Sequence, residues 1–106
     1  MARFLYQASY TAEGTKGLLK DGGSKRRSAV EELTKALGGK LESFYFAFGE
    51  SDVFVIVDVP DQASAAAVSL AVNASGAVNL KTTVLITPEE MDAATKKAVN
   101  YRAPGK

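Results

Sequence analysis

Two carboxylates, Glu42 and Asp58, lie near opposite ends of an apolar stretch, residues 41–59, and are the first groups that could carry chemistry. If this stretch folds back on itself, the two side chains face each other. Like charges held that close repel, so the pKa of one carboxyl should rise, and the pair would suit acid–base work or cation binding. The favoured alternative is that both are surface carboxylates, in water or paired with Arg3 or Lys81.

Two further side chains are candidates for binding a small molecule. Asp52 follows a tight turn at residues 49–51 and could contact a ligand, but the favoured interpretation is a turn hydrogen bond to backbone amides. Tyr6 shares one side of a predicted strand with Phe4, which is typical of a core or interface ring, although its hydroxyl could anchor a ligand. The sequence assigns no catalytic residue.

A basic, glycine-containing turn at residues 20–27 is the third candidate site. It places Ser24, Lys25 and Arg26 at the predicted start of a helix, where free amides and the helix dipole favour anions. The order of residues does not match a phosphate-binding loop of known type. The favoured alternative is a solvated basic surface.

Composition narrows the class of protein. The chain has 106 residues, a formal net charge of +1, no cysteine and no histidine. We therefore expect one domain without a disulfide framework, a metal site or a cofactor, and no bulk attraction to nucleic acid. No stretch resembles a signal peptide or a membrane span, so the expected location is the cytoplasm.

The stretch at residues 41–59 predicts a β-hairpin with arms 41–48 and 52–59, because both arms are rich in aromatic and β-branched residues. With Phe48 opposite Asp52, one face is aromatic and the other is mostly valine. Both faces are too apolar for water, and we expect helices to cover the valine face and another subunit to cover the aromatic one. The interface candidates on that outer face are Phe44, Phe46, Phe48, Phe54 and Ile56.

The remaining elements follow from periodicity and end signals. They are a strand at 3–10, a loop at 11–17 with a short helical turn at 18–20, a helix from the Ser24 N-cap to Gly38-Gly39, a helix from the Asp61 N-cap to Ser75-Gly76, a strand at 78–86, and a helix from the Thr87–Glu90 capping box to about Ala98. This order predicts an α+β fold of the ferredoxin-like split βαβ (βαββαβ) type, an antiparallel sheet with helices on one face, plus a C-terminal helix. The predicted domain is 1–98, and 99–106 is a tail.

The chain also resembles a known family, the GYD domain family of small, mostly bacterial proteins. The matching segments, in order, are Gly14-Thr15-Lys16-Gly17-Leu18, Lys25-Arg26-Arg27, Leu37-Gly38-Gly39, Phe44-Tyr45, Gly49-Glu50-Ser51-Asp52 and Pro60-Asp61. Ser51 stands where the family has the tyrosine of its Gly-Tyr-Asp turn, so a role for that phenol is not carried over. The resemblance implies a ferredoxin-like α+β fold that often pairs through its sheets, and it implies no established activity.

Three functions remain open at this point. The first is a homo-oligomeric module that assembles through its sheet face and binds a small molecule there. The second is a cofactor-free enzyme acting on a small hydrophobic or aromatic substrate, which is a fold-level analogy only. The third is a regulatory module that binds a small anion at the basic turn.

Overall fold

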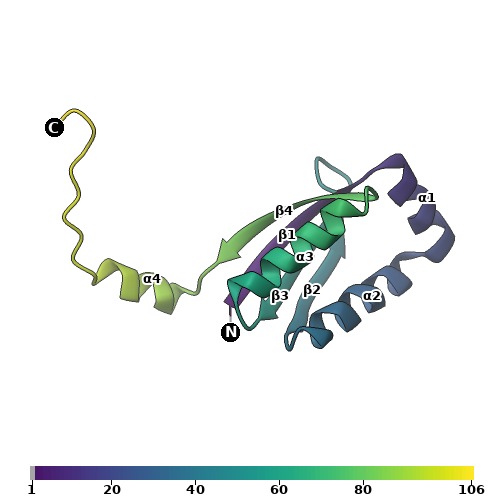
Figure 1. Cartoon of the computed structure of the whole chain (residues 1–106), viewed down its shortest axis with the longest axis horizontal. Coiled ribbons are helices and arrows are strands. Elements are labelled where there is room, and N and C mark those ends of the chain that lie inside the picture. The colour runs from purple at the N-terminus through teal and green to yellow at the C-terminus, as the bar shows by residue number, and fades with distance from the viewer. Residues whose placement is uncertain (1) are drawn as a thin grey trace.

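The computed structural model describes residues 2–106 and shows a mixed α+β fold of four strands and four helices (Figure 1). The elements are β1 (Ala2–Tyr10), α1 (Ala12–Asp21), α2 (Gly23–Ala36), β2 (Lys40–Phe46), β3 (Val53–Val59), α3 (Gln62–Ala74), β4 (Val78–Leu85) and α4 (Pro88–Thr95). The strands form one sheet in the order β2-β3-β1-β4, and every neighbouring pair is antiparallel. The α+β class with an antiparallel sheet is therefore confirmed.

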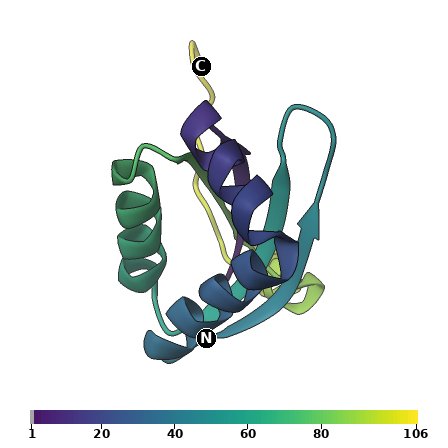
Figure 2. The same ribbon diagram turned by 90° about the vertical axis from the view of Figure 1, so that its right-hand side faces the viewer.

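The core lies on one face of this sheet. Alternate residues of β1 and β3 are buried there, as the period-2 pattern of these strands predicts. The buried set is Phe4, Tyr6, Ala8, Val53, Val55, Val57 and Val59, together with Ala65 and Val78. Val30 of α2 and Val68 and Val72 of α3 pack against this set, so both helices lie on the same face, and Figure 2 shows them standing apart from each other.

The β2–β3 hairpin forms, but its predicted register is wrong. Phe46 pairs with Val53 and Phe44 with Val55, whereas the prediction paired them with Phe54 and Ile56. A one-residue slip exchanges the two faces of a strand. Phe44 and Phe46 therefore share the helix-covered face with the valines, and Tyr45 takes their expected place on the open face.

A β-bulge explains how β2 accommodates this register. The pairing shifts between Leu41 and Ser43, which leaves Glu42 as the extra residue. The bulge lets Leu41 pair with Val57 on the helix face while Phe44 also stays on that face.

The segment that follows β1 is a helix, not the predicted loop. α1 begins after Thr11, whose hydroxyl accepts a hydrogen bond from the Gly14 N–H, and it runs to Asp21.

The N-cap predicted at Ser24 is also wrong. α2 starts at Gly23, and its N-cap position is Gly22, which has φ +80° and no side chain to accept a hydrogen bond. Its conformational freedom lets the chain turn directly from one helix into the next.

The starts of α3 and α4 and the ends of α2 and α3 agree with prediction. Asp61 caps α3, Gly38 and Gly76 take positive φ where α2 and α3 end, and Thr87 and Glu90 form the capping box of α4. α4 ends at Thr95, short of the predicted Ala98, and it projects away from the sheet together with the chain that follows it (Figure 1). Within residues 2–106, no helix combines the length and apolar character that a bilayer crossing requires.

Candidate functional site

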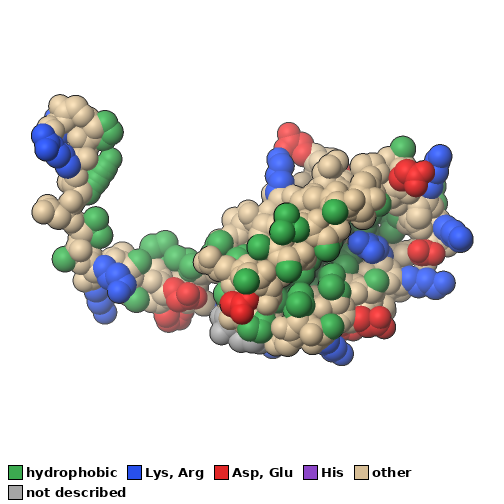
Figure 3. Space-filling model, in the orientation of Figure 1, with side chains coloured by type: hydrophobic (Ala, Val, Ile, Leu, Met, Phe, Trp, Pro, Cys, Tyr) green, Lys and Arg blue, Asp and Glu red, His purple; other side chains and the backbone are tan. Residues whose placement is uncertain are grey.

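An apolar groove lies on the helix side of the sheet, between α2 and α3. Its floor is the buried core face, with Tyr6, Val55 and Val57 among the side chains that form it. Its walls are apolar residues of the two helices, Ala29, Val30 and Leu33 on α2 and Val68 and Val72 on α3. Figure 3 shows hydrophobic side chains in the hollow between these helices. We call this feature the α2–α3 groove.

The groove exists because neither helix is wide enough to cover the valine face. α3 is rich in alanine and serine, so it lies close to the sheet without reaching sideways toward α2. Leu33 remains 39% exposed on α2, although it lines the groove. The cavity volume is about 100 Å³. An apolar cavity of about 150 Å³ holds benzene, so a single ring or a short alkyl chain would fill this smaller groove and extend through its opening.

Two of the hydroxyls that line the groove, those of Tyr6 and Thr34, are already hydrogen-bonded. Tyr6 donates a hydrogen bond to the Ala65 carbonyl at 2.8 Å, and Thr34 donates to the Val30 carbonyl at 2.7 Å. Burial raises the pKa of Tyr6, which keeps its hydroxyl protonated as a donor. Tyr6 therefore links β1 to α3, and its ring, not its hydroxyl, is what it presents to the groove.

Arg26 is the charged residue in the groove lining. It lies in the second turn of α2, is half-buried, and forms no ion pair with any carboxylate in residues 2–106. Ser24 and Lys25, the other members of the predicted anion site, are exposed on the first turn. The structure thus places Arg26 in the groove and leaves the other two at the surface.

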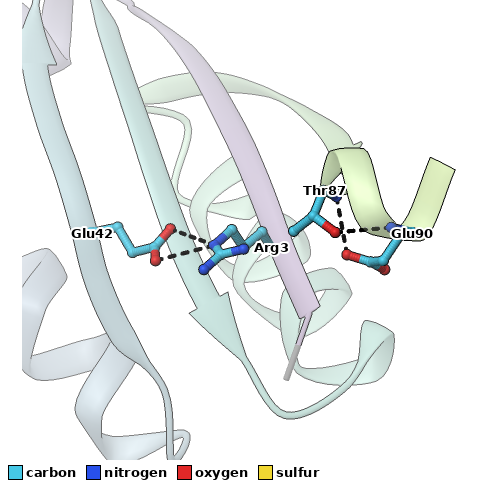
Figure 4. Close-up of polar contacts among 4 residues, drawn as sticks. All are labelled: Arg3, Glu42, Thr87 and Glu90. Carbon is cyan, nitrogen blue, oxygen red and sulfur yellow. Dashed lines mark hydrogen bonds and ion pairs between the residues drawn. The ribbon is translucent and has the colours of Figure 1, made fainter. Parts of the chain in front are cut away.

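Glu42 and Asp58 do not form a carboxylate pair. Glu42 accepts hydrogen bonds from Nε of Arg3 at 2.9 and 3.1 Å, as Figure 4 shows, and this is the predicted alternative of a surface ion pair. The pKa of Arg3 is raised by the hydrogen bond and the charge of Glu42. Asp58 pairs in register with Arg3 and Lys40, and its Oδ1 is buried without a hydrogen-bond partner among the described residues.

Asp52 takes a backbone-binding role. Its Oδ2 accepts from the Tyr10 N–H at 2.9 Å, and its own N–H donates to the Ala8 carbonyl at 2.7 Å. Asp52 does bind a backbone amide, but that amide belongs to β1, so the prediction of a local turn hydrogen bond is wrong. Asp52 joins the hairpin turn to the end of that strand.

The five interface candidates separate into three groups. Phe44 lines the groove, and Phe46 lies beside Gly23 at the start of α2, so neither faces outward from the open sheet face as predicted. Phe48 is fully exposed in the hairpin turn. Phe54 and Ile56 lie half-buried on the open face, where Ile56 pairs in register with Leu5.

Sequence reasoning missed the groove itself. The expectation from the sequence is that helices cover the valine face of the hairpin, with no groove between them. Spacing along each helix shows which side is apolar, but it does not show the distance between two helices on one sheet.

Comparison with known proteins gives one match. The family model described as the GYD domain matches residues 4–95. No curated protein and no solved structure matches the chain.

Proposed function

This chain belongs to the GYD domain family, and we propose that it is a small homo-oligomeric module that binds a small apolar or aromatic molecule in the α2–α3 groove. We further propose that its sheet is of the ferredoxin-like split βαβ type. The strand order β2-β3-β1-β4 supports this, because β1 and β3 are central and each is followed by a helical connection to an edge strand. The expected cytoplasmic location remains part of the proposal.

The observation that carries the proposal is the groove. It opens onto side chains that are otherwise core, including Val53, Val55 and Val57, each at most 5% exposed. Ligand sites are typically concave and mostly apolar, with a few polar groups that fix orientation. Apolar surface removed from water is worth about 25 cal/mol per Å². Because the floor is already nearly covered, a ring placed here gains affinity mainly by burying its own surface and by covering exposed wall residues such as Leu33.

Arg26 indicates the polar part of the ligand. A guanidinium at the edge of an apolar groove can pair with a carboxylate in two parallel hydrogen bonds. The ligand class that satisfies both parts is a small aromatic or short aliphatic carboxylate. A neutral molecule of the same shape should bind the same walls but lose the contribution of the charge.

The test compares benzoate with benzyl alcohol by titration calorimetry and by the rise in melting temperature. We expect benzoate to bind more tightly, and Arg26→Gln to bring the two ligands to similar affinity. Val30→Phe should abolish binding of both by filling the groove. Leu70→Ala is the matched control, because Leu70 lies on α3 but is 73% exposed outside the groove.

Binding of benzoate that is unchanged in Val30→Phe would place the ligand elsewhere and refute the groove as the site. Val72→Phe fills the groove from the α3 side and checks the result independently if Val30→Phe folds poorly.

The homo-oligomeric part of the proposal rests on the open sheet face. Leu5, Phe54 and Ile56 lie half-buried there, and the helices of residues 2–106 that pack on the sheet, α2 and α3, cover its other face. An apolar face of this kind on a small domain is typical of a protein interface.

A further inference from the structure

The chain from Ile86 to Lys106, which we call the C-terminal arm, buries none of its own residues against the rest of residues 2–106. Every residue from Pro88 to Lys106 is exposed, and α4 contributes no buried residue. Three apolar side chains are among those left in water: Ile86 is 49% exposed, Met91 51% and Tyr101 65%. Figure 1 shows the arm leaving the sheet beyond the end of β4.

The arm's helix needs a surface to be stable. α4 spans 8 residues, and isolated helices shorter than about 12–15 residues are marginal in water even with favourable sequences. Its capping box satisfies amides at the N-terminus, where Thr87 and Glu90 bond each other's backbone N–H. The cap fixes where α4 begins, and packing of Met91 against another surface would supply the remaining stability.

A hollow lies under the hairpin turn, mainly over the open sheet face, and it reaches past the edge strand β4 to Asn73 of α3. The turn at residues 47–51 leans over this face and is held there by the Ser9 hydroxyl, which donates to the Glu50 carbonyl at 3.0 Å. The space between turn and sheet has a volume of about 910 Å³. We call it the turn hollow, and its lining includes Gln7, Phe48, Phe54 and Lys81.

The arm of the same subunit starts at the wrong end of the sheet to fill this hollow. Leu85, the last residue of β4, pairs with Arg3 at the beginning of β1. The hollow lies toward the other end, where Phe54 pairs with Gln7 and Asn79 with Ser9. Since α4 also points away from its own sheet, a second copy is the source of an arm that can reach the hollow.

We propose that the C-terminal arm of one subunit docks in the turn hollow of a second copy, and that the two copies exchange arms. This inference rests on the homo-oligomeric part of the proposed function and is independent of the ligand groove. Exchange of identical elements is a low-cost route to a symmetric dimer. Stable interfaces use about 20–30 residues on each side, and an exchanged arm of about twenty residues provides most of one side.

The charges of the two surfaces are complementary. Met91 is flanked by carboxylates at Glu89 and Asp92, and α4 is followed by Lys96 and Lys97. The lining of the hollow combines the rings of Phe48 and Phe54 with one cation, Lys81, and one carboxylate, Glu50. With Met91 on the rings, the acidic turn of α4 can face Lys81 and the two lysines can face Glu50.

The experiment uses the natural absence of cysteine. Full-length Ala94→Cys, with the new thiol on the α4 face of Met91, is mixed with a tagged full-length Ser51→Cys, which lines the hollow. A short bis-maleimide should join one chain of each kind. The control pairs Ala94→Cys with Ala36→Cys, an exposed site on α2, which contributes no residue to the lining of the hollow, and should give no joined product.

Two other variants test the contact without a cross-link. Met91→Asp and Phe48→Asp should each convert the parent oligomer to a monomer in sedimentation at micromolar concentration, and Leu70→Asp should leave the oligomer intact. Two cross-linking results would overturn the proposal. One is that Ala94→Cys chains join only to each other. The other is that, in a chain carrying both substitutions, Ala94→Cys joins only to Ser51→Cys of the same chain. A parent protein that is monomeric would overturn the arm exchange as well. Benzoate binding by that monomer would still test the α2–α3 groove, so the two proposals can fail separately.

Discussion

The side chain of Asp52 binds the backbone N–H of Tyr10, with 2.9 Å between Oδ2 and N. This contact lies just beyond the last β1–β3 pair, Ala8 with Val53, and it continues the strand ladder with a side chain in place of a carbonyl. The Asp52 N–H returns a bond to the Ala8 carbonyl at 2.7 Å. The start of β3 and the end of β1 are therefore held together at two adjacent points.

Asp52→Ala should destabilise the fold by about 1–3 kcal/mol, because it leaves a partly buried backbone donor without an acceptor. Asp52→Asn keeps an acceptor oxygen of the same reach and should cost less. Urea denaturation of the two variants beside the parent measures the difference. Equal stability of Asp52→Ala and the parent would mean that water replaces the carboxylate at no cost.

Gly14 and Gly17 lie in the same helix and should respond to alanine in opposite directions. A Cβ on Gly14 would collide with the carbonyl oxygen of Ala77, which accepts the Thr11 N–H at 3.0 Å and so holds α1 beside the start of β4. We expect Gly14→Ala to cost at least about 1–3 kcal/mol, the usual range for overpacking.

Gly17 is the matched control, because a Cβ there meets nothing within 4 Å. Gly17→Ala should stabilise the protein by about 0.5–1 kcal/mol, since alanine loses less entropy in a helix. Thermal denaturation of both variants is the measurement. If Gly14→Ala is as stable as Gly17→Ala, α1 is not packed against Ala77 as described.

Asp61 should make stability depend on pH. The Ser64 N–H donates to its carboxylate at 2.8 Å, and this hydrogen bond lowers the pKa of Asp61 below its ordinary value of 3.8. The ionised form is thus favoured in the folded state, so its contribution is present above pH 3.8 and disappears as the pH falls through the lowered pKa. α3 packs on the core, so the effect should appear in the unfolding of the whole domain.

Melting temperatures of the parent and of Asp61→Ala, measured from pH 7 down to pH 2, test this dependence. The parent should melt higher at neutral pH, and the gap should close as the pH falls below 3.8. A gap that stays constant over this range would show that Asp61 acts without its charge.

Much of the secondary structure could be predicted, and the failures have local causes. Thr11 is an ordinary N-cap residue, but Gly14 and Gly17 within the next turns suggested a loop, and the close approach to Ala77 that requires Gly14 is visible only in three dimensions. Ser24 suggested a cap, but Gly22 already begins the turn into α2, and Ser24 lies inside the helix.

The candidate site was predicted less well than the fold. The sequence predicts that Tyr6 is a core or interface ring whose hydroxyl could anchor a ligand. In the structure, that hydroxyl donates a hydrogen bond to the Ala65 carbonyl. The sequence predicts one anion site made of Ser24, Lys25 and Arg26, because the three residues are neighbours in sequence. On a helix, residues one or two positions apart point in different directions, so only Arg26 reaches the groove.

The sequence by itself determined the features that depend on a few neighbouring residues. The caps at Asp61 and Thr87 and the ends at Gly38 and Gly76 follow from side chains and φ angles within one turn, and a helix or strand period follows from its own spacing. The tertiary structure decided which face Phe44 and Phe46 occupy, because the bulge at Glu42 shifts a register that residue types alone leave open. It also decided that α2 and α3 stand apart and leave a groove, because the separation of two helices depends on how each packs on the shared sheet.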